Sequence, residues 1–104
     1  MKIWLDDERP APEGWVWIKD PTRMMEIFCF EETLEEISLD HDMGEHYQGR
    51  ELCNGGAVLN MMERLVYEDG WTPPIIHIHT KNPVARKWMM EVANKLNALR
   101  QSNA

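Results

Sequence analysis

Short apolar runs recur along the chain and alternate with longer segments whose apolar residues follow helical spacing. Most runs are rich in β-branched and aromatic residues and end at acidic residues, glycine or proline, as buried strands do. Four strands are predicted on this basis, at residues 2–5, 15–18, 36–40 and 75–79. Helices are predicted over residues 21–30, from residue 50 or 56 to 68, and from residue 83 to beyond 99. Residues 43–49 are expected to form a polar loop.

The ends of the predicted helices carry capping signals. Asp20-Pro21 and Asn82-Pro83 each place an N-cap residue before a proline in the first turn, and Asp69-Gly70 is typical of a helix C-terminus. Gly55-Gly56 is unfavourable inside a helix. Either the helix starts after these glycines, or the close approach of another backbone requires them. One apolar stripe of the last helix is expected to be buried: Val84, Trp88, Val92, Leu96 and Leu99.

The alternation of strands and helices predicts the fold class. It indicates an α/β fold, here a small three-layer sandwich around a mostly parallel four-stranded sheet. The segment 15–18 follows the first strand too closely for a crossover helix, so that strand is irregular or its crossover is a loop. A length of 104 residues fits one domain, 1–104.

The charge is unevenly distributed along the chain and excludes some partners. The formal net charge is −7, with an acidic body over residues 1–80 and a basic C-terminal segment over 81–104. An acidic body argues against binding long double-stranded nucleic acid, but not against binding a small phosphorylated ligand. No apolar run is long enough to span a membrane, and the N-terminus lacks a signal-peptide core, so a cytoplasmic protein is expected. Cys29 and Cys53 lack metal-ligand spacing and are expected to be free thiols.

Acidic residues follow two of the predicted strands and suggest a metal site. Because the carboxyl ends of parallel strands meet at one edge of a sheet, these side chains are expected to lie close together. Clustered carboxylates repel one another unless a cation joins them, and hard divalent cations prefer oxygen ligands. The predicted cofactor is Mg²⁺ or Mn²⁺. The predicted metal ligands are Asp6, Asp7, Asp40 and Asp42.

The residues after the fourth strand suggest an anion site at the same edge. The N-terminus of the last helix offers unpaired N–H groups and the positive end of its dipole. Thr80, Lys81 and Asn82 are therefore predicted to bind phosphate. His41 and His79 are candidates for the acid or base of a phosphoester reaction.

Each of these residues also has a structural interpretation. The acidic residues could be turn formers and helix caps, and Lys81 a solvated charge. For His41 and His79 the structural and the catalytic interpretations stay open. His77 shares a strand face with His79 and is expected to be a core histidine.

Three motifs together resemble a known family. They are Ile3–Pro10 with Pro12 and Gly14-Trp15, Ile37–Asp42 with Gly44, and Ile78–Thr80 with Asn82-Pro83. In this order they resemble the cyclic-phosphate processing receiver-like domains, small proteins common in phages and bacteria. The resemblance covers nearly the whole chain. It implies a receiver-like, flavodoxin-like fold and a location in the cytoplasm of a bacterium or a phage-infected host.

The resemblance also implies roles for individual residues. In receivers, an acid pair after the first strand and an aspartate after the third hold Mg²⁺, and these positions match Asp6, Asp7 and Asp40. The receiver aspartate accepts a phosphoryl group, and a hydroxyl residue follows the fourth strand, where this chain has Thr80. Receivers take a lysine from a fifth strand, which is not predicted in this chain, so Lys81 does not correspond directly to the receiver lysine.

The resemblance implies processing of a cyclic phosphate. The leading hypothesis is a metal-dependent phosphoesterase-type domain that binds or hydrolyses a cyclic phosphate on a nucleotide or RNA end, with Asp40, His41 and His79 at the reaction centre. The alternative is a non-catalytic receiver-like module that binds a nucleotide or a protein, such as a phage protein acting on a host partner. A third hypothesis is a phosphoacceptor switch at Asp40. The sequence alone does not separate these hypotheses, because catalysis and binding need the same anion pocket.

Overall fold

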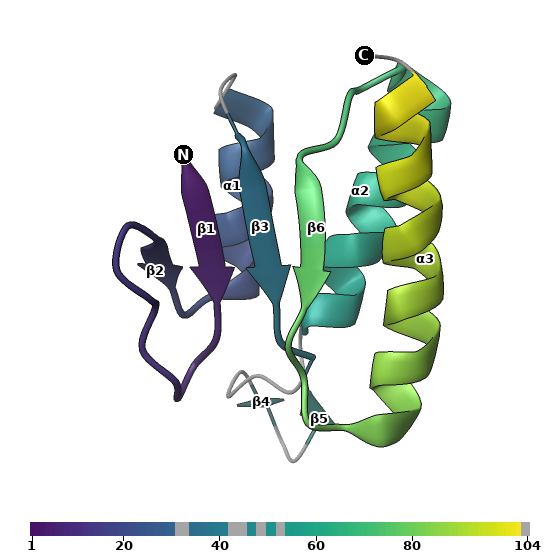
Figure 1. The fold of residues 1–104 in the computed structure, drawn as a ribbon. Helices are drawn as coiled ribbons and strands as arrows, with labels where there is room; N and C mark the ends of the chain where they lie inside the picture. Colours follow the sequence, from purple (N-terminus) through teal and green to yellow (C-terminus); the bar gives the residue numbers. More distant parts are fainter. Residues whose placement is uncertain (31–33, 42–45, 48–49, 52–53, 103–104) are drawn as a thin grey trace.

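The chain folds around a single parallel sheet of four strands. The structure, a computed structural model, describes residues 1–30, 34–41, 46–47, 50–51 and 54–102. The strand order is β2-β1-β3-β6, and every neighbouring pair is parallel (Figure 1). The strands are β1 (Lys2–Leu5), β2 (Val16–Ile18), β3 (Glu36–Leu39) and β6 (Ile75–Ile78), and the helices are α1 (Pro21–Phe30), α2 (Gly55–Asp69) and α3 (Pro83–Ser102). This is the predicted α/β, receiver-like class of fold.

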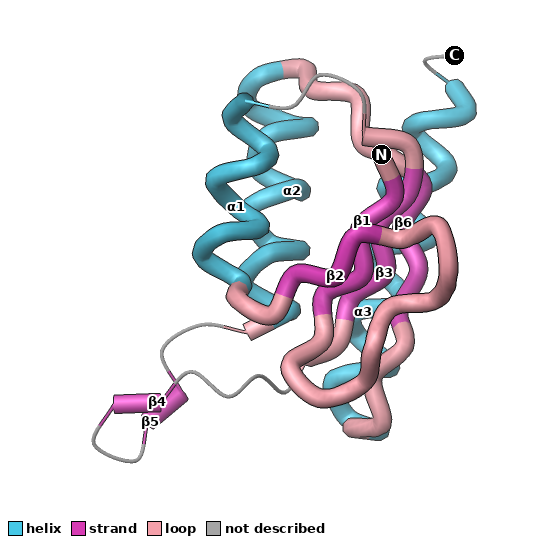
Figure 2. The backbone as a smooth tube through the Cα atoms, turned by 90° about the vertical axis from the view of Figure 1, so that its left-hand side faces the viewer, coloured by secondary structure: helices cyan, strands magenta, loops and turns pink. Residues whose placement is uncertain are grey.

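One face of the sheet carries the core. The register places Ile3, Ile37 and Ile76 side by side, and these residues are at most 3% exposed. Helices α1 and α2 cover this face, whereas the opposite face is covered by the loop 6–15 that joins β1 to β2 (Figure 2). The crossover from β1 to β2 is therefore a loop, which is one of the two solutions that the short spacing allowed.

Helix α3 packs along β6, the last strand of the sheet. In a parallel ladder the backbone groups of alternate residues point to opposite edges, and β6 has a neighbouring strand only on the β3 side. The carboxamide of Asn97 in α3 meets the outer edge: its Oδ1 accepts from the N–H of Ile76 at 2.9 Å, and its Nδ2 donates to the C=O of Ile76 at 3.0 Å. Within the described residues no fifth strand joins this sheet, and one side-chain amide replaces part of the missing ladder.

Replacing Asn97 with alanine is expected to destabilise the fold by about 2 kcal/mol, because both polar groups of a buried backbone residue lose their partner. Thermal unfolding followed by circular dichroism measures this change. Asn94→Ala is the matched control, since Asn94 is exposed on the same helix, and its effect should stay below about 0.5 kcal/mol. Equal losses in the two variants would contradict the edge-capping role of Asn97.

The buried stripe of α3 lies one position away from part of the predicted stripe. Leu96 is fully buried, as predicted, but Val84, also predicted to be buried, is 78% exposed, and the other core residues of α3 are Ala85, Met89 and Ala93. Trp88, Val92 and Leu99 are partly buried and pack against this core. A helix turns by about 100° per residue, so residues one position after those of the predicted stripe face a different direction. Large apolar residues at helical spacing led the prediction to the flank of the true contact face.

The start of α2 was only partly predicted. Asn54 caps the helix by accepting from the N–H of Ala57, and Gly70 ends it with φ 67° and an N–H bond to the C=O of Leu65. A start at residue 50 is wrong, because Arg50–Glu51 forms the short strand β5. This strand pairs with β4, His46–Tyr47, which lies inside the predicted polar loop.

His77 is not a core histidine. It is exposed on the face of the sheet opposite the helices, and its Nε2 lies 3.0 Å from Glu36 Oε1. The prediction correctly placed His77 on the same strand face as His79. It was wrong about burial because, in the part of the chain that the structure describes, a loop rather than a helix covers that face.

Candidate functional site

Three carboxylates meet at the carboxyl ends of β1 and β3. Asp6 and Asp7 directly follow β1, and Asp40 directly follows the neighbouring strand β3. One carboxylate oxygen from each lies within 4.8 Å of the others. The strand ends, the loop after β6 and the first turn of α3 share the lower edge of the molecule in Figure 1. Asp42, the fourth predicted ligand, lies outside the described residues.

Asp6 is fully buried and accepts four hydrogen bonds. Its Oδ1 accepts from the backbone N–H groups of Glu8 at 2.8 Å and Arg9 at 2.9 Å. Its Oδ2 accepts from Arg9 Nε at 2.9 Å and from His79 Nε2 at 3.1 Å. Burial by itself would raise the pKa of Asp6, but the two amides, the guanidinium and the imidazole together hold that pKa below its ordinary value. Asp6 is therefore an ionised carboxylate with its acceptor positions filled.

Arg9 joins the carboxylates to the end of β6. Besides the bond to Asp6, its Nη2 donates to the C=O of His79 at 2.8 Å and lies 3.7 Å from Asp40 Oδ2. About a third of the Arg9 side chain remains exposed. The guanidinium thus supplies positive charge between two of the three carboxylates.

His79 is held by contacts on both ring nitrogens and on one ring face. Its Nε2 bonds to Asp6, its Nδ1 lies 2.6 Å from Ser38 Oγ, and its ring stacks on Trp4 with centroids 3.8 Å apart. Burial is the main cause that lowers the pKa of His79, and the hydrogen bond to Asp6 opposes it. Because the carboxylate of Asp6 only accepts, Nε2 is the donor in that bond, and in a neutral ring the Ser38 hydroxyl then donates to Nδ1. Ser38, Asp6 and Trp4 fix both the position and the tautomer of this imidazole.

Two indoles brace the loop that carries Asp6 and Arg9. Trp4 Nε1 donates to the C=O of Arg9 at 3.0 Å, and Trp17 Nε1 donates to the C=O of Asp6 at 2.7 Å. Both tryptophans come from strands of the sheet, where Trp4 and Trp17 are register partners. The acidic loop is therefore anchored from its backbone as well as through its side chains.

Asp40 sits where β3 meets the start of α2. Its Oδ1 accepts from the N–H of His41 at 2.8 Å, and the N–H of Gly55 donates to the C=O of His41 at 3.1 Å. A Cβ atom on Gly55 would lie 1.5 Å from the backbone oxygen of Asp40. The close approach of two backbones explains this glycine, the second of the two explanations that the sequence allowed. The ring of His41 packs edge-on against Trp88 of α3, 6.3 Å between centroids.

The predicted phosphate-binding residues form the turn into α3. Asn82 Oδ1 accepts from the N–H of Ala85 at 3.1 Å, so its side chain is the N-cap of the helix, as predicted. Thr80 is buried, and its Oγ1 accepts from the N–H of Asn82 at 3.2 Å. Lys81 is exposed. The hydroxyl and the carboxamide therefore shape the turn, while the lysine faces solvent.

The comparisons with known proteins agree with this arrangement. The family model of the cyclic-phosphate processing receiver domain matches residues 1–95. The chain belongs to this family. No curated protein and no solved structure gives a significant match. The predicted family is confirmed, and membership associates this receiver domain with cyclic-phosphate processing.

The carboxylates of this receiver domain suit a hard divalent cation by their chemistry. Three oxygen donors within reach of one another, on two adjacent strand ends, form the kind of set that Mg²⁺ and Mn²⁺ bind. A carboxylate has about four acceptor positions, and Asp6 already uses four. The set fits a cation, provided that Asp6 gives up one of its present partners.

Sequence reasoning did not assign Arg9 or Ser38 to the site. The spacing of Asp6 and Arg9, three residues apart in a turn, was a usable signal, because such a pair can form a local ion pair. Ser38 carried no signal, since a single serine within a strand is common. It reaches the site only because β3 and β6 are neighbours in the sheet.

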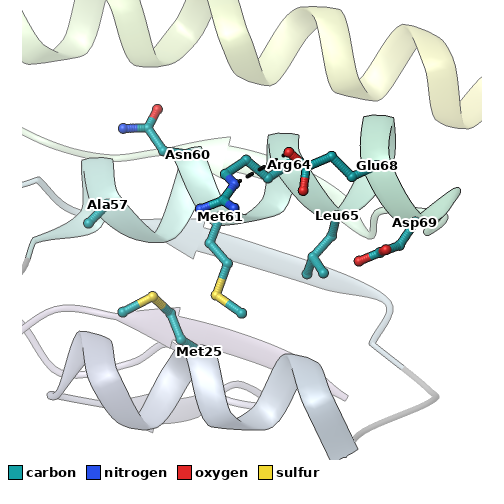
Figure 3. A pocket seen from close by; sticks show the side chains of 8 residues that line it. All are labelled: Met25, Ala57, Asn60, Met61, Arg64, Leu65, Glu68 and Asp69. Atoms are coloured by element: carbon teal, nitrogen blue, oxygen red, sulfur yellow. Dashed lines mark ion pairs between the residues drawn. The ribbon is translucent and has the colours of Figure 1, made fainter.

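Two cavities lie away from these carboxylates. The larger, about 520 Å³, lies between α1 and α2, where Met25 and Met61 point toward one another, and the Arg64–Glu68 ion pair lies beside it (Figure 3). The other, about 290 Å³, is lined by β6 and α3. No three metal-ligating side chains among the described residues cluster at either cavity. Across the ranges that the structure describes, no helix combines the length and the hydropathy that crossing a membrane requires.

Proposed function

We propose that this receiver domain is a metal-dependent phosphoesterase that binds and hydrolyses a cyclic phosphate on a nucleotide or RNA end. The observation that carries the proposal is the convergence of Asp6, Asp7 and Asp40 at one edge of the sheet. Membership in a family named for cyclic-phosphate processing supports the choice of substrate class. The acidic body of the chain favours a small ligand or an RNA end over long duplex nucleic acid.

In this proposal the three carboxylates hold Mg²⁺ or Mn²⁺, with Asp42 as a further ligand or as the group that orients His41. The bound cation supplies charge neutralisation at the phosphate and activates a water molecule. Without a cation, the clustered carboxylates would repel an anionic substrate, so the cation would also lower this repulsion.

The remaining residues act on the phosphate and on protons. Lys81 is exposed beside the N-terminus of α3, where its ammonium and the positive end of the helix dipole favour a phosphate. Thr80 and Asn82 keep this turn in shape. His41, which directly follows Asp40, is the proposed acid or base, while both ring nitrogens of His79 bond to Ser38 and Asp6. His79 then orients Asp6.

The test is a thermal-shift screen of the purified protein with Mg²⁺, Mn²⁺ and 2′,3′-cyclic nucleotides, followed by product analysis. Stabilisation by metal together with nucleotide, and ring opening that EDTA stops, is the expected result. No stabilisation and no product with any combination would reject the proposal.

One observation favours a second candidate, the non-catalytic module that binds a nucleotide or a protein. Arg9 already neutralises part of the negative charge of Asp6 and Asp40, so the folded state does not need a metal ion for this purpose. Ligand-induced stabilisation that is independent of metal and yields no product would support this candidate. Labelling with a small phosphodonor tests the third one, since a phosphoacceptor at Asp40 would form an acyl phosphate.

A further inference from the structure

Arg9 contacts two of the three clustered carboxylates, Asp6 and Asp40. Its Nε bonds to Asp6 at 2.9 Å, its Nη2 lies 3.7 Å from Asp40, and the same nitrogen donates to the C=O of His79. The side chain of Asp6 is 1% exposed and that of Asp40 is 12% exposed. The guanidinium thus serves both carboxylates as an internal counter-ion.

Asp6 can bind a metal ion only if one of its four partners leaves. The N–H groups of Glu8 and Arg9 belong to a backbone that Trp4 and Trp17 anchor. His79 is stacked on an indole and bonded to Ser38. The Arg9 side chain is the partner that can leave, because it is about a third exposed and is held by its guanidinium alone.

We propose that Arg9 is an exchangeable cation that couples the binding of phosphate to the binding of Mg²⁺ at this site. The inference rests on the proposed function and describes how the same site is controlled. A phosphate group offers the guanidinium a forked, charge-assisted pair of hydrogen bonds. Arg9 then turns from Asp6 to the phosphate, and the freed Oδ2 position of Asp6 becomes available to Mg²⁺.

The charges at the site imply that Mg²⁺ and phosphate bind cooperatively. Arg9 neutralises one of three carboxylate charges, so the site without ligands remains net negative and repels phosphate. Mg²⁺ removes that repulsion, and phosphate removes the competition between Arg9 and Mg²⁺. By linkage, each ligand must then raise the affinity for the other by the same factor.

The experiment is a calorimetric titration with Mg²⁺, with and without saturating inorganic phosphate, on the wild type, Arg9→Gln and Arg100→Gln. Phosphate is expected to tighten Mg²⁺ binding to the wild type at least fivefold. Arg9→Gln is expected to bind Mg²⁺ at least fivefold more tightly than the wild type without phosphate, and phosphate should then change its affinity about twofold or less. Arg100→Gln removes an equal charge from the last turn of α3, at the other end of that helix from the site, and it should behave as the wild type.

A second readout and a second variant keep the test decisive. Trp4 and Trp17 donate to the backbone of residues 6–9, so their fluorescence should change when Mg²⁺ binds. This signal does not depend on the heat that calorimetry measures. If Arg9→Gln does not fold, Arg9→Lys takes its place, because a single ammonium lacks the fork that reaches both Asp6 and the C=O of His79. It should tighten Mg²⁺ binding without phosphate at least twofold.

The outcomes separate this inference from the proposed function. If the wild type binds Mg²⁺ and the Arg9 and Arg100 variants change equally, the exchange by Arg9 is overturned, while the metal site stands. If no variant binds Mg²⁺ with or without phosphate, the metal site fails and the exchange fails with it.

Discussion

Asp40→Asn should abolish metal-dependent turnover of 2′,3′-cyclic nucleotides, with a loss of at least about 100-fold. The proposed cation needs anionic oxygens from both neighbouring strand ends, and Asp40 is the only described contribution from β3. Loss of partners outside a metal's first coordination sphere typically costs 10–100-fold, so removal of a ligand should cost at least the upper value. Initial rates with saturating Mn²⁺ measure the effect.

The Asp40→Asn protein should remain folded. Asn keeps an Oδ1 that can accept from the N–H of His41, and the contact of Asp40 Oδ2 with Arg9 is a long one at 3.7 Å. The matched control is Glu26→Gln, which removes one negative charge from an exposed position on α1 and should leave turnover unchanged. Normal turnover by a folded Asp40→Asn protein would refute its assignment as a ligand.

Gly55→Ala should destabilise the fold by about 3 kcal/mol or prevent folding. The added Cβ would lie 1.5 Å from the backbone oxygen of Asp40 and 2.7 Å from its carbonyl carbon. Backbone atoms cannot swing aside as a side chain does, so α2 and the loop after β3 must separate. The alanine gains about 1 kcal/mol of helix propensity, which cannot offset such an overlap. Urea unfolding of the variant measures the change.

Gly56→Ala is the matched control for this overlap. It gains the same helix propensity, and its Cβ would meet the outer ring atoms of Trp88 at 2.8 Å, which a side-chain adjustment can relieve. Its cost should stay below about 2 kcal/mol. Equal stability of the two alanine variants would show that the approach of Asp40 to Gly55 is not a rigid feature of the fold.

Local signals in the sequence predicted the elements of the fold and most of their ends. Asp20 and Asn82 cap helices at the predicted positions, because their short side chains accept from N–H groups within the same turn. Gly70 ends α2 with positive φ, a conformation that favours glycine. These interactions span only a few residues, so they can be read without knowing the fold.

Burial on the outer surfaces of the elements could not be predicted in the same way. His77, predicted to be in the core, is exposed, and Val84, predicted to be buried, lies outside the contact face of α3. Both errors concern which neighbour covers a residue. That depends on segments far away along the chain.

The sequence by itself determined that acidic side chains would follow β1 and β3, because strand and turn signals are local, and that the chain resembles cyclic-phosphate processing receiver domains. Only the tertiary structure decided what those carboxylates contact. Arg9 turns back onto Asp6, Ser38 reaches His79 across the sheet, and Gly55 lets α2 approach Asp40. The physical reason is that hydrogen bonds and close packing depend on distances between atoms within a few ångströms. Such distances between remote segments are set by the packing of the whole sheet against its helices.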